Sequence, residues 1–260
     1  MTDKHTITII TPVYDGGHTY LGQAAESIRA QQLPEGWTWQ WVVQEDGETG
    51  RPFAELPDDP RISTGTGRRM GAAVARTLGL ARATGELVRP LDADDLLTEG
   101  ALLRDIETLT EHPELGWVVS SGLDLLVDGS QTPAPDDFPP GPLPDGEIYR
   151  HYAAGEHRVI SCAVTAHTEL VRAVGGWGAL PASEDSSLLL ALEAAASGWM
   201  IAEPSMLYRK HATQSTRLAE FADPIERATR VASVLARADA LRRTGWRWSP
   251  TSPRTSLTAM

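Results

Sequence analysis

The sequence predicts a single α/β domain in which a mixed, mostly parallel sheet is flanked by helices and followed by a C-terminal helix. In the first half of the chain, strand patterns alternate with helical patterns, an order typical of parallel sheets covered by helices. The chain has 260 residues, which suits one large α/β domain or two small ones. Its hydrophobic fraction of 41% and charged fraction of 22% are typical of a globular protein.

The first half carries the clearest strand and helix patterns. Its first strand is apolar and β-branched and stops at a turn that contains two glycines. In the second strand, Trp37, Trp39 and Trp41 recur at every other position, which indicates one packed sheet face rather than a surface on which sugars stack. The helices carry Leu and Ala at helical spacing. Strands are expected at residues 6–13, 37–44, 87–91 and 117–127, and helices at 21–30, 70–83 and 100–112.

The second half begins with a proline-rich segment at residues 128–146, which we interpret as a loop or flap. The last expected helix has apolar residues along one face. After it, residues 243–260 are polar and rich in Pro, Ser and Thr, so we expect a poorly ordered tail. Strands are expected at residues 159–165, 199–202 and 206–210, and helices at 168–174, 184–197 and 224–242.

Charge and cysteine content narrow the classes of partner. The 35 acidic and 23 basic side chains leave a net charge of −12, which disfavours a nucleic-acid partner. Cys162 is the only cysteine, so no intramolecular disulfide can form, and its apolar neighbours indicate a buried, inert thiol. The N-terminus does not resemble a signal peptide, and no apolar stretch is long enough to span a bilayer. We therefore expect a cytoplasmic protein with no integral membrane segment.

An acidic cluster follows the apolar run at residues 87–91. Asp92, Asp94 and Asp95 stand where ligands bind in α/β sheets, beyond the carboxyl end of a strand. Crowded carboxylates repel one another unless a cation neutralises them or one takes up a proton. Hard oxygen ligands favour Mg²⁺ or Mn²⁺. The alternative is a helix N-cap, which accounts for one aspartate more easily than for three.

Several common site motifs are absent from the sequence. It contains no G-x-S-x-G, H-E-x-x-H or C-x-x-C motif and no P-loop, so serine hydrolases, zinc peptidases and P-loop nucleotidases lack support. A glycine-rich stretch at residues 65–71 differs from the dinucleotide-binding fingerprint because its third glycine comes one residue late. We interpret that stretch as a turn before the next helix.

Six segments form an ordered set along residues 6–215. They are IITPVYD at 9–15, VVQEDG at 42–47, GAAVARTLGL at 71–80, LDADD at 91–95, GGW at 175–177 followed by ED at 184–185, and YRKH at 208–211 followed by QS at 214–215. Taken in this order, they resemble family 2 glycosyltransferases, which have the Rossmann-like GT-A fold and a D-x-D metal motif. One departure is Thr77, which stands where the family usually has Asn, so a donor contact of that amide is absent or altered.

The resemblance implies a GT-A domain over residues 1–242, with a nucleotide-binding half at 1–97 and an acceptor-binding half at 98–242. It also implies a single displacement with inversion at the anomeric carbon. The catalytic residues are expected to be Asp185, as the base, and Glu184. A Mn²⁺ or Mg²⁺ ion is expected at Asp94, Asp92 and His211, and the acceptor side at Gly176 and Trp177. The expected donor-binding residues are Thr11, Pro12, Tyr14, Asp15, Asp46, Arg68, Arg76, Asp92 and Ala93.

Within this set, Asp46 is expected to accept a hydrogen bond from a nucleobase imide, which favours a UDP-sugar donor. Arg76 has two interpretations, a phosphate contact or a bond within the protein. The expected partners are a nucleotide-sugar donor and a small-molecule, peptide or glycan acceptor, and a homodimer is left open. Two alternatives remain: a sugar-1-phosphate nucleotidyltransferase, and an inactive protein of the same fold that only binds nucleotide sugars.

Overall fold

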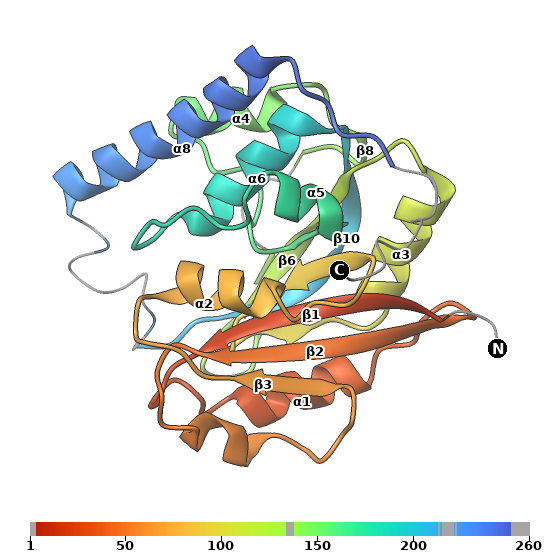
Figure 1. Cartoon of the computed structure of the whole chain (residues 1–260), viewed down its shortest axis with the longest axis vertical. Coiled ribbons are helices and arrows are strands. Elements are labelled where there is room, and N and C mark those ends of the chain that lie inside the picture. The colour runs from red at the N-terminus through yellow and green to blue at the C-terminus, as the bar shows by residue number, and fades with distance from the viewer. Residues whose placement is uncertain (1–3, 134–137, 213, 215–220, 222, 251–260) are drawn as a thin grey trace, which may run out of the picture.

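The computed structural model describes residues 4–133, 138–212, 214, 221 and 223–250. Within these residues, one sheet has the strand order β3-β2-β1-β4-β9-β6-β10-β5, and β7 and β8 extend it beside β6 and β10 (Figure 1). The pairs β1–β2, β1–β4, β2–β3 and β6–β10 are parallel. Strand β9 pairs antiparallel with β4 and β6. The predicted mixed α/β sheet is therefore confirmed.

The first half of the chain folds largely as its pattern predicts. The strands β1 (His5–Val13), β2 (Trp37–Glu45) and β4 (Leu87–Pro90) and the helices α1 (Leu21–Arg29) and α2 (Ala72–Leu80) lie at the expected places. The structure adds β3 (Ile62–Gly65) and a short 3₁₀ helix, η1 (Arg51–Glu55). Both are brief and lie in polar, Gly- and Pro-rich sequence, so they have little periodic signal.

The second half departs more from its pattern. The expected strand at 159–165 is β9 (Val164–His167), and the two strands expected at 199–202 and 206–210 are one strand, β10 (Gly198–Arg209). Its pairing with β6 shifts register between Ile201 and Met206, where the apolar pattern is interrupted. The other elements are β5 (Leu96–Leu97), α3 (Ala101–Glu111), β6 (Trp117–Leu125), β7 (Gln131–Pro133), β8 (Gly141–Pro142), α4 (Glu147–Ala153), α5 (Thr168–Ala173), α6 (Glu184–Ala195) and α8 (Pro224–Thr244).

Two apolar cores lie on opposite faces of the sheet (Figure 1). One contains Ile10 and Val42 with buried residues of α2, α5 and α6, and α8 packs outside α6. The other contains Ile9 with buried residues of α1 and α3. Adjacent strand residues such as Ile9 and Ile10 enter different cores, as the two-residue period of a strand requires. Trp39 and Trp41 are buried in the second core and Trp37 packs against it, so the predicted packed face is confirmed.

The C-terminal segment stays attached to the domain beyond residue 243, where we expected a poorly ordered tail. Helix α8 continues to Thr244, and the Trp248 amide donates to the Ala195 carbonyl at 2.8 Å. The Trp248 ring stacks at a tilt on His167, with ring centroids 4.7 Å apart. The expectation was wrong for residues 243–250, because it rested on their polar composition and did not consider the contacts that Trp248 makes. Residues 251–260 lie outside the described part of the chain. None of the described helices is long and apolar enough to cross a bilayer.

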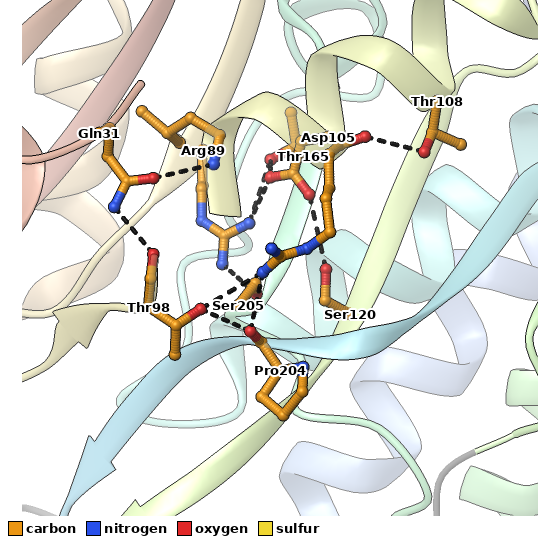
Figure 2. A network of polar contacts seen from close by, with 11 residues as sticks. Gln31, Arg89, Thr98, Asp105, Thr108, Ser120, Thr165, Pro204 and Ser205 are labelled. Atoms are coloured by element: carbon orange, nitrogen blue, oxygen red, sulfur yellow. Dashed lines mark hydrogen bonds and ion pairs between the residues drawn. The ribbon is translucent and has the colours of Figure 1, made fainter. Parts of the chain in front are cut away.

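A buried ion pair joins β4 to α3 directly beneath the acidic motif. Arg89 forms an ion pair with Asp105, and the two side chains are 1% and 0% exposed. Arg89 also donates to Ser205 Oγ of β10 at 2.6 Å, and Thr165 of β9 donates to Asp105 at 2.6 Å. Figure 2 shows these side chains at the centre of a network that extends to Ser120, Thr98 and Gln31. Because Arg89 is three residues before Asp92, this network fixes the end of β4 that presents the aspartates.

Candidate active site

The acidic motif lies at the carboxyl end of β4, where the sequence analysis places it. Strand β10 holds it from the other side, because the Arg209 amide donates to Asp95 Oδ1 at 2.8 Å. The Arg209 guanidinium also donates through Nε to the Asp94 carbonyl at 2.7 Å. Asp95 is buried, whereas the side chains of Asp92 and Asp94 are 30% and 29% exposed. Asp92 and Asp94 are therefore the carboxylates that a ligand can reach.

Asp94 and His211 approach each other from distant parts of the chain. Asp94 Oδ2 lies 2.8 Å from His211 Nε2. Burial and the neighbouring Asp92 raise the pKa of Asp94, while the hydrogen bond with His211 lowers it. Carboxylate oxygens and an imidazole nitrogen are donors that Mn²⁺ accepts, and Mg²⁺ takes the carboxylates. Asp94 and His211 thus offer donors of the kind that a divalent cation takes, and the expected ligand set of Asp94, Asp92 and His211 stays a prediction.

Arg76 connects the acidic motif to the second acidic pair. This residue of α2 is 2% exposed, and its guanidinium forms ion pairs with Asp92, with Glu184 at 2.6 Å and with Asp185 at 3.3 Å. Of the two interpretations of Arg76, the structure shows the bond within the protein. Residues 92 and 184–185 are far apart in sequence, and one guanidinium brings them into a single site.

Asp185 lies at the start of α6 between two hydrogen-bond donors. Trp177 Nε1 donates to Asp185 Oδ1 at 2.8 Å, and Arg76 is closest to Oδ2. Burial raises the pKa of Asp185 to about 7; Arg76 opposes this rise, and Glu184 and Asp92 add to it. A carboxylate with such a pKa can take up a proton near neutral pH.

The loop before α6 has unusual backbone geometry. Ser183 precedes Glu184 and has φ 66°, the only positive φ of a non-glycine residue in the described ranges. Gly175 and Gly176 also have positive φ values, of 86° and 65°. Arg237 of α8 holds this loop by donating to the Val174 and Gly176 carbonyls, the latter at 2.9 Å. Trp177 is 3% exposed, so its indole lies inside the protein beside Asp185.

The residues expected to bind the donor nucleotide gather around the ends of β1 and β2. Thr11 and Pro12 are buried, and Thr11 Oγ1 accepts from Trp41 Nε1 at 2.9 Å. Asp15 pairs with Arg51 at 3.0 Å. Tyr14 is 42% exposed. Thr11 and Pro12 are thus buried, whereas Tyr14 and Asp15 remain partly accessible to solvent.

Asp46 and Arg68 lie on the side of α2. Asp46 Oδ1 accepts from the backbone amides of Met70 at 2.6 Å and Gly71 at 2.9 Å, so it fixes the turn into that helix. Arg68 is exposed in the same turn, and Ala93 is buried beside Asp92.

Three residues of the site carried little sequence signal. The sequence analysis quoted Arg209 in a motif but gave it no role, although it holds two aspartates. Arg237 lies in a helix of ordinary composition. Cys162 was interpreted as an inert core thiol, and it is buried with a pKa that burial and nearby carboxylates raise. Its sulfur nevertheless lies beside Asp92 and Asp95.

Comparisons with known proteins agree with this fold. A structure of S. aureus TarS residues 1–349 matches with a TM-score of 0.66 and 15% identity over 91% of this chain and 69% of that one. The same TarS segment in complex with UDP-GlcNAc matches with a TM-score of 0.64 and 16% identity over 92% and 74% of the two chains. A longer TarS structure matches with a TM-score of 0.60 and 15% identity over 79% of this chain, which spans only 37% of TarS there. These similarities confirm the fold.

No curated protein matches the sequence. The family known as "Glycosyl transferase family 2" matches residues 8–153, more than half of the chain. The matched range runs from within β1 to the end of α4 and includes the acidic motif. The chain is thus a glycosyltransferase that belongs to glycosyl transferase family 2.

Proposed function

We propose that this protein transfers a sugar from a UDP-sugar to a nucleophilic acceptor in a single displacement that inverts the anomeric carbon. The observation that carries the proposal is the shared guanidinium of Arg76, which pairs with Asp92 on the donor side and with Glu184 and Asp185 opposite. A displacement needs stabilisation of the leaving group and a base for the acceptor. The S. aureus TarS structures with UDP-GlcNAc and with UDP support a uridine nucleotide as the donor.

On the donor side, the leaving diphosphate develops negative charge. Asp94, Asp92 and His211 would hold a divalent cation, Mn²⁺ or Mg²⁺, which neutralises that charge when it is bound. Arg68, in the turn before α2, is assigned to a phosphate contact, because its side chain is exposed there. The nucleoside is assigned to Thr11, Pro12, Tyr14, Asp15, Asp46, Asp92 and Ala93.

The amide contacts of Asp46 use Oδ1. Its Oδ2 is the atom that we assign to the imide N–H of uracil. This assignment keeps the role that the sequence analysis gave Asp46 and adds a second one, the support of the turn into α2.

On the acceptor side, Asp185 takes the proton of the attacking hydroxyl. Its pKa of about 7 suits a base that must hold a proton briefly and release it. Glu184 is a weaker candidate, because its Oε1 is tied to Arg76 at 2.6 Å. Trp177 and Gly176 shape the wall beside this carboxylate, with Trp177 orienting the base from inside the protein.

The proposal is tested by the donors that stabilise the protein. A bound ligand raises the melting temperature by mass action, so UDP-, dTDP- and GDP-sugars are compared with and without Mn²⁺. We expect the largest shift with a UDP-sugar and Mn²⁺. Asp94→Asn should remove the Mn²⁺-dependent part of that shift, with Asp58→Asn, at an exposed position after η1, as the surface control. An Asp94→Asn protein that keeps the whole shift would show that the ligand assignment is wrong.

Transfer is separated from simple binding by donor hydrolysis. An active enzyme releases UDP slowly when water replaces the acceptor, whereas an inactive homologue binds UDP and Mn²⁺ but releases no sugar. Detection of free sugar from the stabilising donor supports the enzyme. Formation of a nucleoside triphosphate from the same donor and added pyrophosphate would favour the sugar-1-phosphate nucleotidyltransferase instead.

A further inference from the structure

Cys162 places a thiol among the carboxylates of the acidic motif. Its Sγ and one carboxylate oxygen each of Asp92 and Asp95 all lie within 4.8 Å of one another. Cys162 lies just before β9, whereas the two aspartates follow β4, and the two strands are paired. The cluster is therefore held by the sheet rather than by a flexible surface loop.

Asp95 has a buried oxygen that no described residue satisfies. Its Oδ1 accepts from the Arg209 amide, but Oδ2 is buried without a hydrogen-bond partner in the described part of the chain, and the residue is 1% exposed. A buried, unpaired carboxylate oxygen is costly, and buried carboxylates that lack a pairing group commonly coordinate metals. This orphaned oxygen is an observation independent of the thiol, and a cation bound in the cluster would satisfy it.

The ligand set differs from the one assigned to the donor cation. Asp94 and His211 offer an oxygen and a nitrogen, and they contact each other at 2.8 Å. The cluster around Cys162 offers sulfur and two oxygens, and thiolates select thiophilic cations such as Zn²⁺ over Mg²⁺. Zinc ligands lie roughly 3.5 Å apart around the ion, so small side-chain rotations would close the cluster around it.

We propose that Cys162, Asp95 and Asp92 form a binding site for a thiophilic divalent cation, Zn²⁺, beside the donor-cation site. The cation enters at Asp92, because the Asp92 side chain is 30% exposed while Cys162 and Asp95 are buried. Binding converts the thiol to a thiolate and releases its proton to solvent. A solvent molecule completes a tetrahedral shell.

Zinc at this site has a consequence for the transferase reaction. Asp92 belongs to both ligand sets and also pairs with Arg76. A cation that holds Asp92 toward Cys162 withdraws it from the donor and from Arg76. Zinc therefore acts as an inhibitor that Mn²⁺ does not displace at Cys162. This consequence rests on the proposed function, whereas the binding site itself does not.

The test uses the fact that Cys162 is the only cysteine of the chain. Co²⁺ is titrated into the full-length protein, free of nucleotide, and the thiolate-to-cobalt charge-transfer band in the near ultraviolet is recorded. Any such band reports Cys162 alone. We expect a band that saturates at one Co²⁺ per chain, that does not depend on protein concentration, and that Zn²⁺ abolishes by competition. The concentration series excludes a cation that bridges the thiols of two chains.

Variants separate the three ligands from the donor-cation residues. Cys162→Ser should lose the band while it keeps the melting temperature and the Mn²⁺-dependent shift with UDP. Asp95→Asn should weaken Co²⁺ binding by about tenfold or more, because loss even of outer-shell partners costs 10–100-fold in affinity. His211→Ala is the matched control, and it should keep the band. Circular dichroism of each variant checks that it is folded.

The outcomes are distinct. Absence of a band in the wild-type protein at saturating Co²⁺ overturns the site. A band that has the same affinity in folded Asp95→Asn means that the thiol binds without the cluster, which also overturns it. A wild-type protein that shows the cobalt band but no Mn²⁺-dependent shift of its melting temperature with UDP would contradict the proposed function and leave the Cys162 site standing.

Discussion

Trp177 donates its indole N–H to Asp185 Oδ1 at 2.8 Å, and Arg76 approaches Oδ2 of the same carboxylate at 3.3 Å. The carboxylate is thus oriented by one neutral donor and one cation, from the loop before α6 and from α2. The pair links a residue expected on the acceptor side to the residue expected to act as the base. It explains how a buried indole can matter for turnover without touching the acceptor.

Trp177→Phe should slow turnover and leave donor binding unchanged. The substitution keeps an aromatic ring and removes a hydrogen bond to a charged group, which is worth about 1.5–3 kcal/mol. Because that bond favours the ionised carboxylate, its loss should also raise the pKa of Asp185 and move the acidic limb of the rate profile to higher pH. Steady-state kinetics over a pH series measures both effects. An unchanged kcat together with a raised KM for the donor would contradict this role.

The pH dependence of turnover follows from the raised pKa of Asp185. Burial raises this pKa to about 7, so the carboxyl group is protonated below that pH and ionised above it. Only the ionised form can accept a proton from the acceptor. We therefore expect kcat/KM to fall tenfold per pH unit below about 7 and to reach a plateau above it. A rate that is constant from pH 5 to pH 8 would exclude Asp185 as the base.

Arg76→Met should destabilise the protein, because the acidic residues around it would then repel one another. It removes the guanidinium that pairs with Asp92, Glu184 and Asp185, and breaking a buried ion pair costs about 3–5 kcal/mol. Urea unfolding measures the loss. Arg68→Met, in the exposed turn before α2, is the matched control and should change the stability little. Equal free energies of unfolding for the two variants would show that the ion pairs of Arg76 do not stabilise the site.

The buried pair of Arg89 and Asp105 allows a test of positioning against stability (Figure 2). Arg89→Met or Asp105→Leu alone leaves an unpaired buried charge and should cost about 3–5 kcal/mol. The double variant should recover much of that loss, because apolar pairs can replace buried ion pairs. Its UDP release should still be slower than that of the wild type, since the end of β4 is then less fixed. A double variant with wild-type turnover would limit the network to a role in folding.

The sequence indicates which acidic residues are candidates for this site better than it indicates the contacts between them. Asp92, Asp94 and the pair Glu184 and Asp185 could be selected as candidates because strand ends and ordered motifs mark them. The ion pairs of Arg76 were only one of two interpretations, because no local pattern tells which partners a buried arginine meets. Trp177 was expected on the acceptor side, and its bond to Asp185 depends on a loop geometry that spacing does not reveal.

The elements that escaped the sequence analysis share one property. They are β3, η1, β5 and α4, together with β7 and β8 inside the segment 128–146 that was expected to be a loop or flap; all are short, and their apolar residues are too few to define a period. The predicted break in β10 reflects Pro204, which interrupts the pattern although the strand continues past it. Trp248 gave residues 243–250 an anchor that composition alone concealed. In each case a tertiary contact, rather than a local preference, decides the structure.

The account as a whole rests on Asp185 acting as the base opposite a donor held at the acidic motif. The most direct test is the rate of UDP release from the stabilising UDP-sugar by Asp185→Asn, compared with Glu184→Gln. General-base catalysis contributes about 10²–10⁴-fold, so Asp185→Asn should release UDP at least a hundredfold more slowly while it keeps the thermal shift with UDP and Mn²⁺. An Asp185→Asn protein that is folded, binds UDP and releases it at the wild-type rate would contradict the account.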